Sequence, residues 1–394
     1  MEFAGIDIGA DRHTVAVLGA DGTVRVPPTP FGENAEGYAH CRAVLGAPAD
    51  TVVALEATGH YWKNVVAFLL AEGFAIVLLN PLRTHRFAQA ELQRAKTDAL
   101  DAVGIARLAA EKRPAPTRLP DAATQELREL VRFRDRMVQD LGDRVRQLHR
   151  LVDLGFPEFT RHVRTLDSEL ATTLLQAYPT AAAFRGVAER ELANLLYAGR
   201  RSVGRRLART LLTAAAASVG HHHGAVYQLQ VRCLCEDIAL LRRRLGGLAR
   251  DIERTLDDHE VGQLLTTIDG IGTQTAARLV AELGDPAEFR DAAALASYVG
   301  VVPAIRQSGK RQPLRAGLTP IGHARLRKAL WMPTVAAIRI NPWLRAFYLR
   351  LRARGKLPKV ALVAAMRKLL AAIYSVAKHR RPFVPHVTLL EVPT

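Results

Sequence analysis

The first 80 residues alternate between short apolar runs and turn residues, which predicts a sheet. Apolar runs predict helices over residues 35–44, 61–72, 83–92 and 97–111 where their period is helical. Residues 27, 28 and 30 are prolines and are expected to end the opening meander, after an Asp-Gly turn at 21–22. Strands are expected over residues 3–8, 14–18, 23–26, 51–56 and 75–79. Three antiparallel strands followed by alternating helix and strand predict a mixed α/β sheet.

The pattern becomes helical after a proline-rich linker at residues 114–120. Long helical patterns cover residues 122–154 and 226–256, and their length predicts an antiparallel coiled-coil hairpin. Further helices are expected over residues 167–177, 275–283, 291–298, 321–338, 343–353 and 359–378. We therefore expect three domains: an α/β domain over 1–115, a helical, coiled-coil assembly region over 121–260, and a mainly α-helical domain over 261–394.

The excess positive charge lies in the last quarter of the chain. The formal net charge is +17. Val301–Thr394 holds 19 of the 55 Lys and Arg residues but a single acid, Glu391, so the first 300 residues are close to neutral. One-sided positive charge is typical of a surface that binds a polyanion. We expect nucleic acid to be the partner, and not a membrane surface.

Nothing in the sequence indicates export or membrane insertion. The first residues lack the basic and apolar regions of a secretory signal. No apolar run approaches the roughly 18 to 20 residues that are needed to cross a bilayer. The three cysteines, Cys41, Cys233 and Cys235, form neither a disulfide framework nor a zinc-binding spacing. These features predict a protein of the reducing cytoplasm.

Four carboxylates form a candidate metal site. Asp7 lies inside an apolar strand pattern and Glu56 ends another, and a buried carboxylate needs a partner or a cation. Asp98 and Asp101 lie three apart in the first turn of a predicted helix, a spacing that a solvated helix face also shows. Oxygen ligands suit Mg²⁺. A strand Asp, a strand-end Glu and a helical acid pair is the order of carboxylates in ribonuclease H-like nucleases, where metal ions polarise a phosphate.

A glycine-containing turn is a candidate phosphate contact. Gly270 and Gly272 separate two helical patterns, as in a helix-hairpin-helix motif. The glycines would let the backbone approach a phosphate, which the N–H groups opening the second helix can bind. The alternative is a simple tight turn between two helices. The basic segment that follows favours phosphate binding.

Ser308 is a candidate nucleophile. It precedes Gly309 in a non-helical stretch, and Lys310 and Arg311 follow. Such a hydroxyl could attack a phosphate that the cations hold. No general base stands beside it in the sequence, and any Ser-Gly pair in a basic loop would look similar. The other basic residues expected to contact nucleic acid are Arg315, Arg325, Arg327 and Lys328.

Several short motifs resemble the DEDD transposases of bacterial insertion sequences, which are relatives of the Piv-type DNA invertases. Near the amino terminus they are GIDIG at 5–9, LEATGHYW at 55–62, NP at 80–81 and KTDALDA at 96–102. In the last third they are IDGIG at 268–272, LGDP at 283–286, YVGVVP at 298–303 and QSGK at 307–310. The motifs keep the family's order at both ends of the chain. Residues 120–260 match only as long helices.

The resemblance implies a ribonuclease H-like, RuvC-like first domain with acids at Asp7, Glu56, Asp98 and Asp101, and a transposase domain with a nucleophilic Ser308. It implies Mg²⁺ as cofactor and a structured bridge RNA that selects donor and target DNA by base pairing, while the protein recognises shape and backbone. It also implies a dimer of dimers, assembled through the coiled-coil helices, in the bacterial cytoplasm. The protein would associate with the nucleoid when bound to DNA.

The chain departs from the family pattern at residues 319–323. The family has a basic residue and Gly-Asn before the Leu-Arg of the next helix. This chain has Thr-Pro-Ile-Gly-His there, ending at His323. The departure bears on local DNA or RNA contacts and leaves Ser308 in place.

Three other functions stay open on the residues alone. A RuvC-like nuclease or resolvase would use water as the nucleophile. An actin-like ATPase or sugar kinase also opens with GIDIG and a hairpin, but it needs a later Gly-rich phosphate-binding strand pair, which we do not find in the sequence. A non-enzymatic RNA-binding scaffold would explain the basic segment but not the metal-ligand acids.

Overall fold

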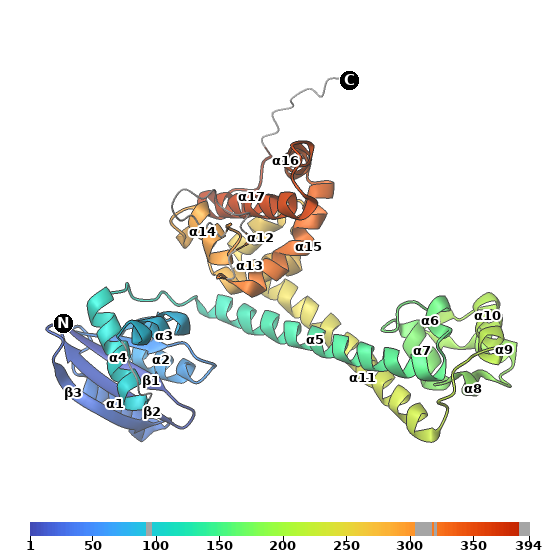
Figure 1. Ribbon diagram of the computed structural model, residues 1–394, viewed down its shortest axis with the longest axis horizontal. Coiled ribbons are helices and arrows are strands. Elements are labelled where there is room, and N and C mark those ends of the chain that lie inside the picture. The colour runs from blue at the N-terminus through green and yellow to red at the C-terminus, as the bar shows by residue number, and fades with distance from the viewer. Residues whose placement is uncertain (92–96, 304–316, 319–320, 386–394) are drawn as a thin grey trace, which may run out of the picture. The chain divides into compact units, whose positions relative to one another are not determined.

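The protein is described by a computed structural model that covers residues 1–91, 97–303, 317–318 and 321–385. The chain divides into two compact units, Met1–Leu119 and Pro120–Thr394 (Figure 1). The boundary falls in the proline-rich linker that the sequence indicates. A further division of the second unit near residue 261 stays a prediction.

The first unit is a five-stranded mixed sheet with helices on both faces. Its elements are β1 (Glu2–Ile8), β2 (Arg12–Gly19), β3 (Val24–Gly32), α1 (Ala35–Leu45), β4 (Thr51–Glu56), α2 (Trp62–Ala71), β5 (Ala75–Leu79), α3 (Pro81–Ala90) and α4 (Asp98–Lys112). The strand order is β3-β2-β1-β4-β5, with β1 to β3 antiparallel and β4 and β5 parallel to β1. This confirms the predicted mixed α/β sheet.

The prediction that prolines end the meander was wrong. β3 continues to Gly32, and Pro30 lies opposite Thr14 of β2. A proline has no N–H to donate, but an edge strand pairs on one side only and tolerates the loss. β3 is such an edge, because among the described residues it pairs with β2 alone.

Each face of the sheet has its own apolar core. Ile6, Val15 and Leu55 pack with Val65 and Leu69 of α2 on one face. On the other face, Phe3, Ala54 and Val77 pack with residues of α4, among them Ile105 and Leu108. The two sets alternate along β1 and β4, as the period of a strand requires.

β1 and α4 are in close backbone contact at Gly5. A Cβ added at Gly5 would lie 2.1 Å from the carbonyl oxygen of Ala102 and 2.4 Å from the backbone nitrogen of Ala106. Backbone cannot move aside as a side-chain end can, so only glycine fits at this position.

The second unit is largely helical. Its elements are α5 (Ala122–Gly155), α6 (Phe159–His162), α7 (Glu169–Ala177), α8 (Ala181–Phe184), α9 (Glu189–Asn194), β6 (Leu196–Tyr197), β7 (Arg201–Ser202), α10 (Arg205–Ala216), α11 (Ala225–Asp257), α12 (Glu260–Thr266), α13 (Thr273–Leu283), η1 (Pro286–Glu288), α14 (Ala292–Val299), α15 (Ala324–Ile340), α16 (Pro342–Ala353) and α17 (Pro358–His379).

The long helices α5 and α11 lie side by side in opposite directions (Figure 1). The start of α5 and the end of α11 share one core with α12 to α17, through Leu127 and Leu256. The end of α5 and the start of α11 share another core with α6 to α10, through Leu151 and Val231. The antiparallel helical pair is as expected, whereas coiled-coil packing stays a prediction.

α17 is a core helix that is more apolar than the sequence analysis indicated. It is long and apolar enough, by composition alone, to cross a membrane, although Arg367 and Lys368 interrupt it. More than half of that stretch is buried, with Leu369 and Ile373 fully enclosed. Burial in the second unit therefore accounts for its composition.

We predict that Gly5→Ala destabilises the first unit by roughly 1–3 kcal/mol, because the added methyl group forces α4 off the sheet. Differential scanning calorimetry should show a lower Tm for one unit only. Gly247→Ala is the control, since Gly247 lies within α11 with nothing near its position for a Cβ, and it should not lower the Tm. An unchanged Tm in Gly5→Ala would show that α4 is not seated as described.

Candidate active site

Asp7 and Glu56 lie on the face of the sheet that α4 covers. Asp7 is two residues beyond Gly5 on β1, and Glu56 is two residues beyond Ala54 on β4. Residues two apart in a strand point to the same face. The register pairs Ile6 with Leu55. Asp7 and Glu56 are the next residues on these two strands, so both acids lie at the same end of neighbouring parallel strands.

Asp98 and Asp101 occupy the first turn of α4, as predicted. Thr97 caps this helix, its hydroxyl accepting a hydrogen bond from the Leu100 N–H at 3.3 Å. Acids in a first turn also complement the helix dipole, which supports the helix without any metal. Asp101 directly precedes Ala102, the residue packed against Gly5. The contact between α4 and β1 thus has an acid close to it on each element.

Two threonines that the sequence analysis missed hold the Glu56 carboxylate. The Thr58 hydroxyl donates to Oε1 at 2.6 Å, and the Thr84 hydroxyl of α3 donates to Oε2 at 2.5 Å. The first follows from the sequence, since Thr58 lies two residues after a strand-end acid. The second joins residues 28 apart and has no local signal.

The donor set fits a hard divalent cation by chemistry, because all four candidate side chains offer carboxylate oxygens. Within the described part of the chain, no group of three or more His, Cys, Asp or Glu side chains is gathered closely enough to hold a metal. Asp7 and Asp101 each have a partner. The backbone brings the acid-bearing elements together, and a metal site at these four acids stays a prediction.

Ser308, Lys310, Arg311 and Arg315 lie outside the described residues. The chain on either side of this stretch is described. Pro303 and Leu318 form a β-bridge. Gly300 and Gly322 touch, since a Cβ at Gly322 would lie 2.5 Å from the Cα of Gly300. The two flanks of the Ser308 stretch are therefore joined at its base.

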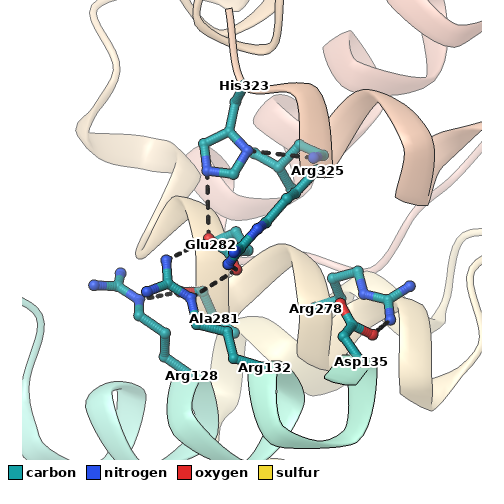
Figure 2. Close-up of polar contacts among 9 residues, drawn as sticks. Arg128, Arg132, Asp135, Arg278, Ala281, Glu282, His323 and Arg325 are labelled. Atoms are coloured by element: carbon teal, nitrogen blue, oxygen red, sulfur yellow. Dashed lines mark hydrogen bonds and ion pairs between the residues drawn. The ribbon is translucent and has the colours of Figure 1, made fainter. Parts of the chain in front are cut away.

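A buried carboxylate ties this base to α5 (Figure 2). Glu282, at the end of α13, is 7% exposed. Arg132 of α5 donates to both of its oxygens, at 2.8 and 3.0 Å, and His323 Nε2 lies 3.3 Å away. Burial acts to raise the pKa of Glu282, but the hydrogen bonds from His323 and Arg132 outweigh it and hold that pKa well below its ordinary value. Glu282 is therefore ionised in the folded protein.

His323 caps α15 and contacts Glu282. Its Nδ1 accepts a hydrogen bond from the Leu326 N–H at 3.3 Å and so caps the helix. With Nδ1 as acceptor the ring proton belongs on Nε2, which faces Glu282. Its backbone N–H donates to the Tyr298 carbonyl at 2.9 Å. His323, which stands where the family has asparagine, thus caps α15 and also contacts Glu282. We had expected α15 to begin at 321, and this cap sets its start at Ala324.

The other predicted nucleic-acid contacts differ in their surroundings. Arg325 is exposed and lies 3.9 Å from Glu282. Lys328 is exposed, whereas Arg327 donates to the carbonyls of Val299 and Ile321 and so serves the base of the Ser308 stretch. Gly270 packs against Ala337 of α15, while Gly272 caps α13 with open space beside it. A phosphate-binding role for this turn stays a prediction.

Comparison with known families identifies the chain. Residues 4–157 match a transposase family of the IS110 DEDD type, and residues 262–349 match the family described as transposase IS116/IS110/IS902. The chain belongs to this transposase family. It is accordingly an enzyme of the class that acts on DNA.

Known relatives span most of this transposase. An uncharacterized 43.6 kDa protein of insertion element IS110 from Streptomyces coelicolor is 28% identical, over 78% of this chain and 76% of its own. A 44.8 kDa protein of IS116 from Streptomyces clavuligerus is 27% identical, over 97% and 96%. The pilin gene-inverting protein of Moraxella bovis is 26% identical, over 84% and 80%.

Among solved structures, the RuvC of T. thermophilus in complex with a Holliday junction substrate aligns with this chain at 17% identity and a TM-score of 0.23. The alignment covers 29% of the transposase and 99% of RuvC. At this score the similarity carries no argument about the transposase's activity.

We predict that Glu282→Gln destabilises the second unit of the transposase by about 2 kcal/mol at neutral pH, because Arg132 and His323 lose a charged partner. The folded pKa of Glu282 is depressed, so its contribution is complete above the ordinary value of 4.5 and is lost as the pH falls toward the lower folded pKa. Urea unfolding followed by tryptophan fluorescence should show the difference between wild type and variant shrinking below pH 4.5.

Two controls separate the roles in this network. Glu288→Gln removes an exposed carboxylate nearby and should leave stability unchanged. His323→Asn keeps a capping side chain but cannot reach Glu282 in the same way, so it should lose part of the stability without unfolding α15. A Glu282→Gln protein as stable as the wild type at neutral pH would contradict the assignment.

Proposed function

We propose that the protein is a Mg²⁺-dependent, RNA-guided DNA transposase that cuts and rejoins DNA through a phosphoserine intermediate. Its nucleophile is Ser308, and its acids are Asp7, Glu56, Asp98 and Asp101. The observation that carries the proposal is the placement of Asp7 and Glu56 at the same end of adjacent parallel strands, facing the helix that begins with the other two acids.

The threonine contacts support a working role for Glu56. Both of its oxygens accept short hydrogen bonds, from Thr58 and from Thr84. A carboxylate fixed in this way is pre-organised, so less freedom is lost when it acts on a ligand. The four acids would hold Mg²⁺, which would supply Lewis-acid stabilisation of charge on the phosphate oxygens.

The serine step conserves phosphodiester energy. The Ser308 oxygen bonds to a DNA phosphorus while the bond from that phosphorus to one DNA oxygen breaks, and the proton lost by the serine hydroxyl is balanced by one that the leaving DNA oxygen takes up to become a hydroxyl. A DNA hydroxyl from the other duplex then attacks the phosphoserine and releases the serine. One ester bond replaces another at each stage, so strand exchange needs no ATP.

The proposal includes a bridge RNA that pairs with donor and target DNA. It rests on the family resemblance and on the basic carboxy-terminal segment. The gene-inverting relatives of Moraxella, named for a DNA rearrangement, support recombination as the outcome. The active form is a dimer of dimers in the cytoplasm, where the acids of one subunit meet Ser308 of another.

We predict that Ser308→Ala abolishes the covalent protein–DNA adduct, because no oxygen remains to bond to phosphorus. The assay traps the protein on nicked donor DNA with Mg²⁺ and the RNA from the flanking non-coding DNA, then separates adducts under denaturing conditions. Ser297→Ala in α14 is the matched control and should still form adduct. An adduct that persists in Ser308→Ala would refute the serine assignment, and cleavage without any adduct in the wild type would favour a hydrolytic, RuvC-like nuclease.

We further predict that Asp7→Asn removes Mg²⁺-dependent cleavage, by a factor of at least about a hundred, because one anionic ligand is lost from the site. The amount of RNA that copurifies should not change, since the charge lost is far from the basic segment in sequence. Asp11→Asn, in the turn after β1, is the control for the loss of one acid. Full cleavage by Asp7→Asn would exclude a catalytic role for this residue.

A further inference from the structure

Two cations lie beside two aromatic rings at the surface of α16 and α17. The ammonium of Lys368 lies 4.4 Å from the ring centre of Trp343 and 4.8 Å from that of Phe347. The guanidinium of Arg350 lies 5.5 Å from the ring centre of Phe347. Phe347 is thus in contact with two cations at once, and attraction to its π-electrons holds both in place.

This cluster has no acid of its own to neutralise it. From Pro342 to His379 the chain has nine Lys and Arg residues and no Asp or Glu. Among the described residues, no carboxylate lies within ion-pair distance of Arg350, Arg367 or Lys368. Burial lowers the pKa of Lys368, and the nearby Arg350 lowers it further, as expected where like charges crowd together. An anion placed between these cations would relieve their repulsion.

A hollow beside the cations gives that anion a place. Its volume is about 480 Å³, and Phe347, Arg367 and Lys368 line it together with four alanines, Ala292, Ala293, Ala364 and Ala371. The small alanine side chains leave the floor open. Asp291, the nearest acid in sequence, is already engaged, because it caps α14 and pairs with Arg290.

We propose that Arg350, Arg367 and Lys368 form a phosphate clamp that grips the backbone of a double-stranded nucleic acid. The proposal rests on the proposed function and adds a binding surface to it, apart from the acids and from Ser308. Seven of these nine cations lie on the successive helices α16 and α17, and the other two lie in the connection between them. Such a spread of charge fits an extended polyanion better than a single carboxylate. The rings are occupied by cations and are not free to stack on bases, so the clamp reads backbone and not sequence.

The clamp is tested by fluorescence anisotropy of the full-length protein with labelled duplex DNA and duplex RNA of arbitrary sequence. Lys368→Met keeps the aliphatic packing on both rings but removes the charge, and Arg367→Gln removes a second charge. For each cation removed, the slope of log Kd against log salt should fall by about 1, and Kd at physiological salt should rise roughly fivefold to tenfold. The duplex that shows the loss identifies whether DNA or RNA is held.

Two further variants separate a built clamp from net charge. Phe347→Leu keeps every charge but removes the ring that holds two of them, so Kd should rise roughly twofold to fivefold with an unchanged salt slope. Arg243→Gln removes an exposed cation from α11 and should leave Kd unchanged. Equal losses in Arg243→Gln and Lys368→Met would overturn the proposal, and so would losses confined to single-stranded oligonucleotides. Circular dichroism checks that each variant is folded.

Binding and catalysis fail independently in these assays. If the clamp variants bind duplex as the wild type does while the Ser308 adduct still forms, the clamp is wrong and the transposase mechanism stands. If the clamp variants lose affinity but the adduct persists in Ser308→Ala, the clamp stands and the serine mechanism is wrong.

Discussion

The backbone contact between β1 and α4 is the constraint on which the candidate acid site depends. Because Gly5 has no side chain, the helix lies directly on the strand, with Ala102 and Ala106 as its contact points. Asp101 and Asp7 are each close to this contact along their own elements. Their separation is therefore set by main-chain atoms, which repack less readily than side chains do. Glu56 is fixed by a different means, two hydroxyl groups that hold its carboxylate from opposite oxygens.

In the second unit, a buried charge adds a constraint to the apolar cores. Burying Glu282 is costly unless its charge is paired, and the pairing groups come from two elements far apart in sequence, Arg132 of α5 and His323 at the start of α15. The carboxylate is fully paired only when α5, α13 and α15 meet in one arrangement. The cations near Phe347 differ, since aromatic rings position them and no acid of the described residues pairs with them.

The sequence predicted what depends on local periodicity and missed what depends on distant pairs. Alternation along β1 and β4 located Asp7 and Glu56, and helical spacing located the acids of α4. The prediction from the prolines of β3 was wrong, because proline interrupts a strand only where its missing N–H would donate to a neighbouring strand. The roles of Glu282 and Thr84 could not be predicted from the neighbouring sequence, since each residue forms its hydrogen bond with a partner at least 28 residues away. The Ser308 stretch was identified by its motif alone and lies outside the described residues.

The proline-bearing edge of the sheet has a consequence for how copies of the protein can associate. An open edge strand normally offers a row of donors and acceptors that a second strand can join, and uncontrolled joining leads to aggregates. Residues 27, 28 and 30 are prolines, so this edge strand has three fewer N–H donors than a strand without proline. Sheet-to-sheet extension is therefore disfavoured at β3, and this edge of the sheet is a poor surface for the dimer of dimers that we propose.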